Sequence, residues 1–185
     1  SGGSVFGLAA GDGVAKILSK QNIGLNFTET MPAVPIVVGA ILFDLVNGGD
    51  KNWDLDTPYH DLGIKALSDA QERNGARFHL GNHGAGLGAR AGNKEGGLGS
   101  ASLDLGDGLM VGALVAVNSV GSVFMPDGKT YWAQPFAYGD ELGGQKSNPN
   151  QDPAIQPIPD DPKLKARTDG TNPTTGGIAT TAKIT

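Results

Sequence analysis

The sequence predicts a layered α/β domain. Segments with helical periodicity, at residues 4–20 and from residue 57 onward, alternate with Val- and Ile-rich apolar runs at residues 34–45 and 109–117. Hydrophobic residues make up 38% of the 185 and charged residues 18%, which is enough apolar material for a packed core. The 30 glycines follow no Gly-X-Y period, so a collagen-like chain is excluded.

A helix is predicted over residues 4–20, with Ser4 as its N-cap. Glycines within this segment each lower the helix propensity by up to about 1 kcal/mol. Glycine inside a helix indicates close approach of a neighbouring backbone, so we expect this helix to be buried. The apolar residues at helical spacing are Phe6, Ala10, Val14, Ile17 and Leu18.

Residues 34–45 (VPIVVGAILFDL) form a near-continuous apolar run, which is typical of a central strand covered on both faces. A turn is predicted at residues 47–50 (NGGD). Thr57 and Pro58 predict the start of a second helix, which Asn74 and Gly75 would end. Its expected apolar face consists of Tyr59, Leu62, Ala66 and Ala70.

Residues 81–100 predict a long Gly-rich loop, because they contain little apolar periodicity. Residues 109–117 (LMVGALVAV) predict a second buried strand that residues 120–125 continue, and residues 126–129 (PDGK) predict a hairpin turn.

The expected domain organisation has three parts. Residues 1–138 form the core of a single α/β domain. Residues 139–173 form an exposed linker, since five of the eleven prolines fall between Pro149 and Pro162. Residues 174–185 form the first strand of a further part.

Charge and composition exclude several classes of partner. The 14 basic residues against 19 acidic ones leave a net charge of −5 without a basic cluster, which argues against a nucleic-acid partner. The absence of cysteine excludes disulfides, thiolate metal sites and cysteine nucleophiles. The longest apolar stretch, residues 35–46, is too short to span a bilayer and contains Asp44, so no membrane partner is expected. Residues 1–4 do not resemble a signal peptide, and the sequence does not indicate a cellular compartment. We expect the chain to be a piece of a longer protein.

Two short motifs have simple alternatives. Residues 86–91 (GLGARA) match a dinucleotide-binding pattern, but that pattern needs a following helix, which the glycines at residues 92–99 disfavour. His79 and His83 stand four residues apart, as helix-borne zinc ligands do, yet the residues between them are poor helix formers. We therefore predict neither a nucleotide site nor a metal site.

Three other residues each allow two interpretations. Asn118 ends an apolar strand, where its amide either points into a cleft or caps a turn, and composition favours the turn. Lys94 is either a solvated charge or a cation beside a nucleophile. Thr174, within residues 171–175 (TNPTT), is either an ordinary loop residue or a residue whose α-amine self-cleavage would release beside its hydroxyl.

Four ordered stretches carry a resemblance to a known family. They are residues 2–14 (GGSVFGLAAGDGV), residues 35–45 (PIVVGAILFDL), residues 81–102 with their GNHGAG and GGLGSAS segments, and residues 112–121 (GALVAVNSVG). In this order and spacing they resemble the L-aminopeptidase/D-esterase family, which includes the β-peptidyl aminopeptidases and the nylon-oligomer endohydrolase. The resemblance covers most of residues 1–140 and resumes at residues 171–185.

The resemblance implies a self-processing amidohydrolase with a four-layer α-β-β-α sandwich like that of N-terminal nucleophile hydrolases, incomplete in this chain. In such enzymes a precursor cuts itself before a Ser or Thr, and the freed residue attacks amide or ester carbonyls through an acyl-enzyme. Implied partners are a small peptide or amide substrate, the protein's own C-terminal portion after cleavage, and further copies of the chain in a tetramer or larger assembly. No metal or other cofactor is implied.

The resemblance also implies roles for four residues. Asn118 matches the family's oxyanion donor, and Lys94 falls near a lysine that supports the charge at the site. Phe43 stands where several members have a Tyr, so it can line the substrate pocket but offers no hydroxyl. Thr174 is the expected nucleophile, with its own α-amine as base, after cleavage of the Pro173–Thr174 bond.

Two departures from the family pattern keep an alternative open. An ungapped alignment puts Pro173 at the nucleophile position, and proline before the scissile bond restricts its geometry. Phe43 lacks the hydroxyl. Thr175 therefore stays open as the nucleophile, and the chain could instead be a non-catalytic relative that acts as a structural or small-molecule-binding oligomer. Substrate length, chirality and α or β linkage stay open too.

Overall fold

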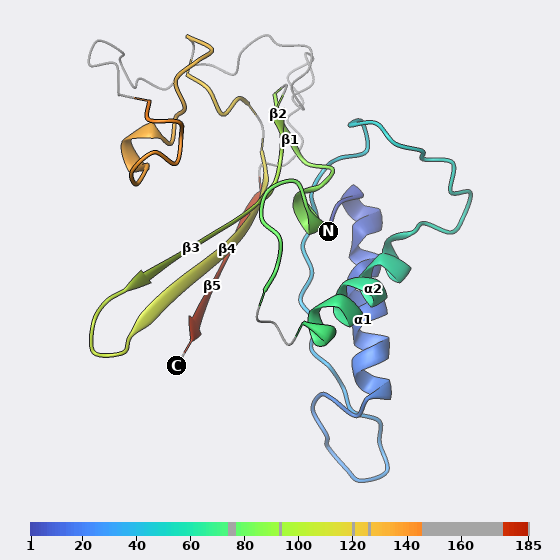
Figure 1. Cartoon of the computed structure of the whole chain (residues 1–185). Coiled ribbons are helices and arrows are strands. Elements are labelled where there is room, and N and C mark those ends of the chain that lie inside the picture. Colours follow the sequence, from blue (N-terminus) through green and yellow to red (C-terminus); the bar gives the residue numbers. More distant parts are fainter. Residues whose placement is uncertain (74–76, 93, 120, 126, 146–175, 185) are drawn as a thin grey trace. The chain divides into compact units, whose positions relative to one another are not determined.

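The computed structural model describes residues 1–73, 77–92, 94–119, 121–125, 127–145 and 176–184 (Figure 1). Helices and small sheets are both present, in agreement with the predicted α/β class, whereas the four-layer sandwich stays a prediction. The chain divides into two compact units. Unit 1 comprises residues 1–89, 96–118 and 177–185, and unit 2 comprises residues 90–95 and 119–176.

The predicted first helix is confirmed as a 3-10 turn, Ser4–Leu8, that continues into α1, Ala9–Lys20. The prediction of Ser4 as the N-cap is wrong. The N-cap is Gly3, which has a φ of 86°, and no side chain of the turn itself forms a capping hydrogen bond. Asp44 contributes the acceptor instead, because its Oδ1 accepts the Gly3 N–H at 2.6 Å.

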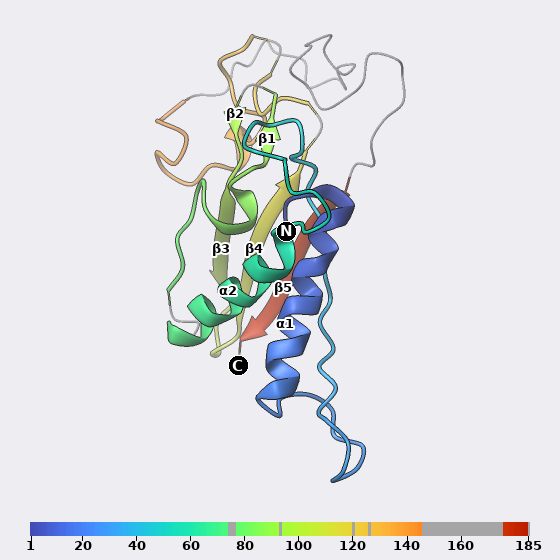
Figure 2. The same ribbon diagram turned by 90° about the vertical axis from the view of Figure 1, so that its right-hand side faces the viewer.

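The second helix, α2, spans Tyr59–Glu72 with Pro58 as its N-cap and packs against α1 (Figure 2). Glycines at the crossing make this approach possible. A Cβ at Gly13 would lie 2.3 Å from the His60 carbonyl oxygen, and one at Gly63 would lie 2.2 Å from the Ala10 carbonyl oxygen. Both distances are far below van der Waals contact, so any side chain at either position would push the helices apart.

Burial in the helices is narrower than predicted. Gly13 is the buried residue of α1, so the expectation of a wholly buried helix is wrong outside the crossing. In α2 the buried residues are Tyr59 and Gly63, whereas the predicted face residues Leu62, Ala66 and Ala70 are exposed. The periodicity indicated the helix correctly but not its inner face, since the α2 groups nearest to Gly13 are the His60 carbonyl and Ile64 Cγ1.

Residues 34–45 are not the predicted central strand. Val34 forms a single antiparallel bridge with Leu25, after which the segment is extended without a ladder. Ile36 and Val38 are 76% and 88% exposed, while Leu42 is only 1% exposed. Leu42 pairs instead with the start of the chain, where its N–H donates to the Ser1 carbonyl at 2.7 Å and its carbonyl accepts the Ser4 N–H at 3.0 Å. An apolar run cannot reveal whether another strand lies beside it to complete a sheet.

A three-stranded sheet in unit 1 has the order β3-β4-β5 (Figures 1 and 2). Strands β4, Met110–Asn118, and β5, Gly176–Ile184, confirm the strands predicted there. The prediction that residues 109–117 are buried is wrong, because every residue of β4 is exposed or half-buried. Strand β3, Leu98–Asp104, was not predicted. It pairs antiparallel with β4 from Leu98↔Ala116 to Asp104↔Met110, which carries Asn118 to the end of the sheet.

The Gly-rich region is not the continuous loop that was predicted. It contains a 3-10 turn, Gly84–Gly86, and the two-residue strands β1, Arg90–Ala91, and β2, Lys94–Glu95, before β3 begins. Within the described ranges, no helix is long and apolar enough to cross a bilayer.

In unit 2, a bridge between Phe124 and Tyr131 supports the predicted hairpin turn, and the 3-10 turn Gln134–Phe136 follows. Among the described residues of 120–125, Phe124 alone takes part in strand pairing, so the predicted continuation of β4 is wrong there. Residues 146–173 of the predicted linker lie outside the described residues.

The helix crossing predicts opposite effects for two glycines of α1. Gly13→Ala should lower the free energy of unfolding by about 1–3 kcal/mol, because the added methyl overpacks the contact with α2. Gly11→Ala should raise it by up to about 1 kcal/mol, because the nearest atom to its Cβ, Val37 Cγ1, is 3.8 Å away and only helix propensity changes. Urea denaturation followed by circular dichroism measures both, and changes of the same sign would contradict the observed crossing.

Candidate active site

The structure brings together two of the predicted site residues, Phe43 and Asn118, both in unit 1. The Phe43 N–H donates a hydrogen bond of 2.9 Å to Asn118 Oδ1, although 75 residues separate them in sequence. Asn118 lies two positions beyond Ala116, the last β4 residue paired with β3. Both residues are half-buried. This bond therefore joins the end of β4 to the extended segment 42–44.

The bond determines which way the Asn118 amide faces. A backbone N–H needs an acceptor, so the amide oxygen must be the atom directed at Phe43. The NH₂ group then lies on the other side of Cγ. The turn-capping interpretation of Asn118 does not account for this long-range bond, which contributes about 0.5–1.5 kcal/mol to stability in a typical case.

Asp44 lies next to Phe43 in a cluster of close backbone contacts that we call the glycine junction: Gly2, Gly3 and Gly88 around the Asp44 carboxylate. The carboxylate accepts the Gly3 N–H at 2.6 Å. A Cβ at Gly2 would lie 2.0 Å from Asp44 Oδ2, and one at Gly88 would lie 2.4 Å from it. Only glycine lets two backbone segments approach the carboxylate this closely.

Two asparagine side chains hold the Gly-rich turn that ends at the glycine junction. Asn47 Nδ2 donates to the Gly88 carbonyl at 2.8 Å. Asn82 Nδ2 donates to the carbonyls of Leu87 and Gly96, each at 3.0 Å. Residues 84–88 are thus tied to the segment after Phe43 and to the start of β3.

The structure also describes the dinucleotide-like motif and the histidine pair of the sequence. Residues 86–91 end in β1, and the described residues from 87 to 104 contain no helix that a pyrophosphate would need. The rings of His79 and His83 have centroids 5.0 Å apart, but the described part of the chain contains no group of three or more His, Cys, Asp or Glu placed to hold a metal.

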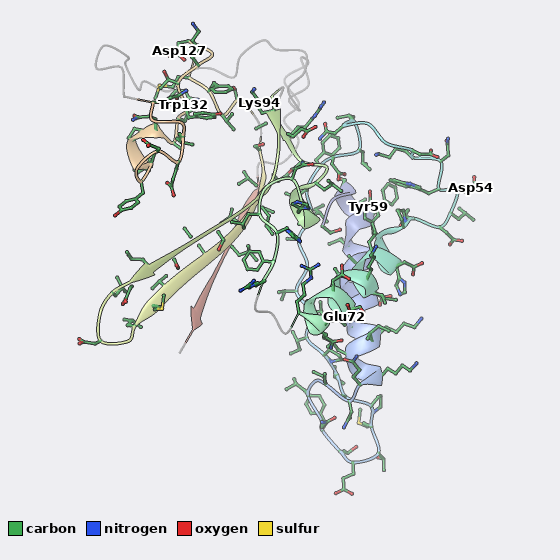
Figure 3. All side chains as sticks on the ribbon, viewed as in Figure 1. Asp54, Tyr59, Glu72, Lys94, Asp127 and Trp132 are labelled. Carbon is green, nitrogen blue, oxygen red and sulfur yellow. The ribbon has the colours of Figure 1, made fainter. Side chains whose placement is uncertain are left out.

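Tyr59 packs at the glycine junction from the first turn of α2 (Figure 3). A Cβ at Gly3 would lie 2.1 Å from its ring, and the ring of Trp53 meets it edge-on at 5.5 Å. Burial, and secondarily the negative charge of Asp44, raise the pKa of Tyr59 above its ordinary value. Its hydroxyl therefore stays protonated at neutral pH.

Lys94 lies on β2 of unit 2 and is described within that unit (Figure 3). Its backbone pairs with Ala91, and its Nζ lies 5.3 Å from the centroid of the Phe124 ring. A cation over an aromatic face contributes about 0.5–1 kcal/mol at an exposed position. Thr174 lies outside the described residues.

The sequence reasoning missed Asp44, Asn47 and Asn82 as organising residues of this site. Asp44 could have been recognised, since it is the one charged residue in the apolar run of residues 34–45. The two asparagines could not, because asparagine beside glycine is common in ordinary turns.

Asn118 offers a test of the bond to Phe43. Asn118→Ala leaves the half-buried Phe43 N–H without this acceptor and should lower the free energy of unfolding by about 1–3 kcal/mol. Asn118→Asp keeps an oxygen that can accept the Phe43 N–H, so it should lower the free energy of unfolding clearly less than Asn118→Ala does. Urea denaturation compares the two variants, and equal losses would mean that the hydrogen bond to Phe43 does not contribute.

Tyr59 predicts a loss of stability at alkaline pH. The unfolded chain releases the tyrosine proton near pH 10, whereas the folded protein holds it to higher pH. The stabilisation is present below about pH 10 and is lost as the pH rises through the folded pKa. Difference absorbance at 295 nm between wild type and Tyr59→Phe measures the pKa, and Asp44→Asn should lower it. A Tyr59 that titrates at its ordinary value would contradict the burial and charge described above.

Comparison with known proteins gives consistent results. The model of Peptidase family S58 matches residues 1–182. A protein of Mycobacterium leprae named as an uncharacterized aminopeptidase is 37% identical over 185 residues, which cover 100% of this chain and 48% of that protein. One of Mycobacterium tuberculosis with the same kind of name is 41% identical over 126 residues, covering 68% of this chain and 34% of that protein. The chain thus spans at most about half the length of these relatives.

Proposed function

The chain belongs to peptidase family S58, the L-aminopeptidase/D-esterase family that its sequence resembles, and on that premise we propose that it is part of a self-processing amidohydrolase. Family membership and the aminopeptidase names of the relatives support a peptidase function. The proposed substrates are short peptides or amide oligomers, and the proposed nucleophile is an N-terminal threonine.

The observation that carries this proposal is the orientation of the Asn118 amide. Its oxygen accepts the Phe43 N–H at 2.9 Å, which makes the NH₂ group the donor side of the amide, and we assign that side to the substrate carbonyl. Attack on an amide carbon places negative charge on the carbonyl oxygen, and a pre-oriented donor stabilises that charge. Loss of one such donor typically costs about 10²–10³ in kcat.

Self-processing would begin with the Thr174 hydroxyl. Its oxygen attacks the carbonyl carbon of Pro173, the hydroxyl proton passes to the Thr174 nitrogen as the C–N bond breaks, and the acyl group moves from nitrogen to oxygen as an ester, which frees the α-amine. Water then hydrolyses the ester, which releases the Pro173 carboxylate and restores the Thr174 hydroxyl. That amine stands beside the hydroxyl and serves as its base in later turnovers.

Turnover would repeat this chemistry on a substrate in trans. The Thr174 α-amine takes the hydroxyl proton as the oxygen attacks, Asn118 donates to the oxyanion, and the proton passes to the leaving amine as the C–N bond breaks. Water hydrolyses the acyl-enzyme. We assign Lys94 the support of the negative charge and Phe43 an apolar wall of the substrate pocket.

The larger assembly is a proposal as well. The C-terminal portion would stay bound after cleavage, because it carries the nucleophile of the same site. Further copies of the protein would assemble into a tetramer or larger oligomer, as the family resemblance implies.

Autoprocessing has a direct test in the intact mass of the full-length gene product. Wild-type protein should split into two fragments, and N-terminal sequencing should find Thr174 at the start of the second. Thr174→Ala should abolish cleavage, because the attacking oxygen is gone, whereas the neighbouring Thr175→Ala should leave cleavage within about threefold of wild type since that hydroxyl takes no part.

Two outcomes would contradict the proposal as written. A new N-terminus at Thr175 would move the nucleophile by one residue. A single uncleaved chain after long incubation that also fails to hydrolyse amino-acid p-nitroanilides would favour the non-catalytic relative, in which Pro173 and Phe43 have removed the chemistry.

A further inference from the structure

We propose that Asp44 is a positioning residue that holds the Asn118 amide in its orientation by fixing the backbone of Phe43. This inference rests on the proposed function, because the position of the Asn118 amide matters for catalysis only if Asn118 binds the oxyanion. Asp44 touches no reacting atom in this proposal and acts through its neighbour in the chain.

The first step is the adjacency of the two hydrogen bonds. Phe43 N–H donates to Asn118 Oδ1 at 2.9 Å, and the next residue, Asp44, accepts the Gly3 N–H at 2.6 Å. Leu42, on the other side, pairs through its N–H with the Ser1 carbonyl at 2.7 Å. The Phe43 peptide is therefore held from both sides, although residues 34–45 belong to no sheet that could hold it otherwise.

The second step is the tightness of the contacts around the carboxylate. Gly2 and Gly88 approach so closely that a Cβ on either would fall within 2.4 Å of Asp44 Oδ2. Asn47, three residues after Asp44, adds its bond to the Gly88 carbonyl at 2.8 Å. The side chain of Asp44 is thus closely packed between two other backbone segments.

The third step is the strength of the anchor. A carboxylate that accepts a backbone N–H forms a charge-assisted bond, which is about twice as strong as a neutral one. Gly3 is the N-cap of the 3-10 turn that leads into α1, and a negative charge at such a helix start is favourable. Asp44 therefore fastens the segment that carries Phe43 to the first helix.

The consequence is a chain of contacts from the first helix to the candidate oxyanion donor. Without the Asp44 carboxylate, the Phe43 N–H would drift from Asn118 Oδ1, and the NH₂ group would lose its orientation. A displacement of about 1 Å at a reacting group can cost about 10²-fold in rate, so a partial loss of order should cost about tenfold.

The experiment compares Asp44→Ala, Asp44→Asn and a control, Asp69→Ala, in the full-length protein. Asp69 is an exposed residue of α2, and its replacement removes the same charge. Hydrogen exchange with electron-transfer fragmentation reports the Phe43 amide. In wild-type protein the bond to Asn118 should protect the Phe43 amide from exchange. We expect this amide to exchange about tenfold faster in Asp44→Ala and at the wild-type rate in Asp69→Ala. Asp44→Asn keeps an acceptor for Gly3 and should recover most of the protection.

The kinetic arm uses hydrolysis of L-alanine p-nitroanilide. Asp44→Ala should lower kcat about tenfold with KM within twofold, because the lost interaction belongs to the transition state. In an Asn118→Ala background, the same substitution should change the remaining kcat less than twofold, because the group it positions is absent.

Two results would overturn the inference. One is wild-type exchange of the Phe43 amide in Asp44→Ala. The other is an equal tenfold fall in both backgrounds, which would mean a general structural role. If the wild-type protein neither cleaves itself nor hydrolyses the anilide, the proposed function fails, and the exchange measurement alone decides whether Asp44 holds Phe43 in place.

Discussion

The hydrogen bond from the Phe43 N–H to Asn118 Oδ1 is the interaction on which the candidate site depends. It spans 75 residues and joins a strand end to a segment that no sheet supports. The β3–β4 pairing places Asn118 at the end of the strand, and the hydrogen bonds of Leu42 and Asp44 hold Phe43 beside it. The two sets of contacts meet at this bond.

Glycine makes this arrangement possible at a few positions of close backbone contact. At the α1–α2 crossing, Gly13 and Gly63 let each helix touch the backbone of the other. Around Asp44, Gly2 and Gly88 let two segments close on one carboxylate. Glycine in the middle of a helix costs about 0.5–1 kcal/mol relative to alanine, and the close contact between the two helices offsets that cost.

Local patterns predicted the parts of the fold that local forces determine. Helical spacing indicated the helices, and the Val- and Ala-rich run of residues 109–117 indicated β4. The apolar run of residues 34–45 was misread, because strand formation needs a partner that the run itself does not specify. β3 was missed since its alternating small residues, Gly99 to Ser102, resemble a loop until β4 lies beside them.

The candidate site was predictable to a similar extent. The family resemblance pointed to Asn118 and Phe43, and the structure brings these two together. Composition could not show that a backbone N–H would orient the amide, because the sequence does not record which distant segments meet. Asp44 illustrates the same point, since its charge was visible in the apolar run but the glycines around it come from residues 2, 3 and 88.

The most direct measurement of the central claim is the NMR signal of the Asn118 NH₂ group in the full-length protein with ¹⁵N-labelled asparagine. A peptide aldehyde supplies the probe, because a tetrahedral adduct places an oxyanion where the substrate's would form. The account predicts that the Asn118 NH₂ proton signals move downfield when the adduct forms. Signals that stay unchanged while the aldehyde is bound covalently would contradict the assignment of Asn118 as the oxyanion donor.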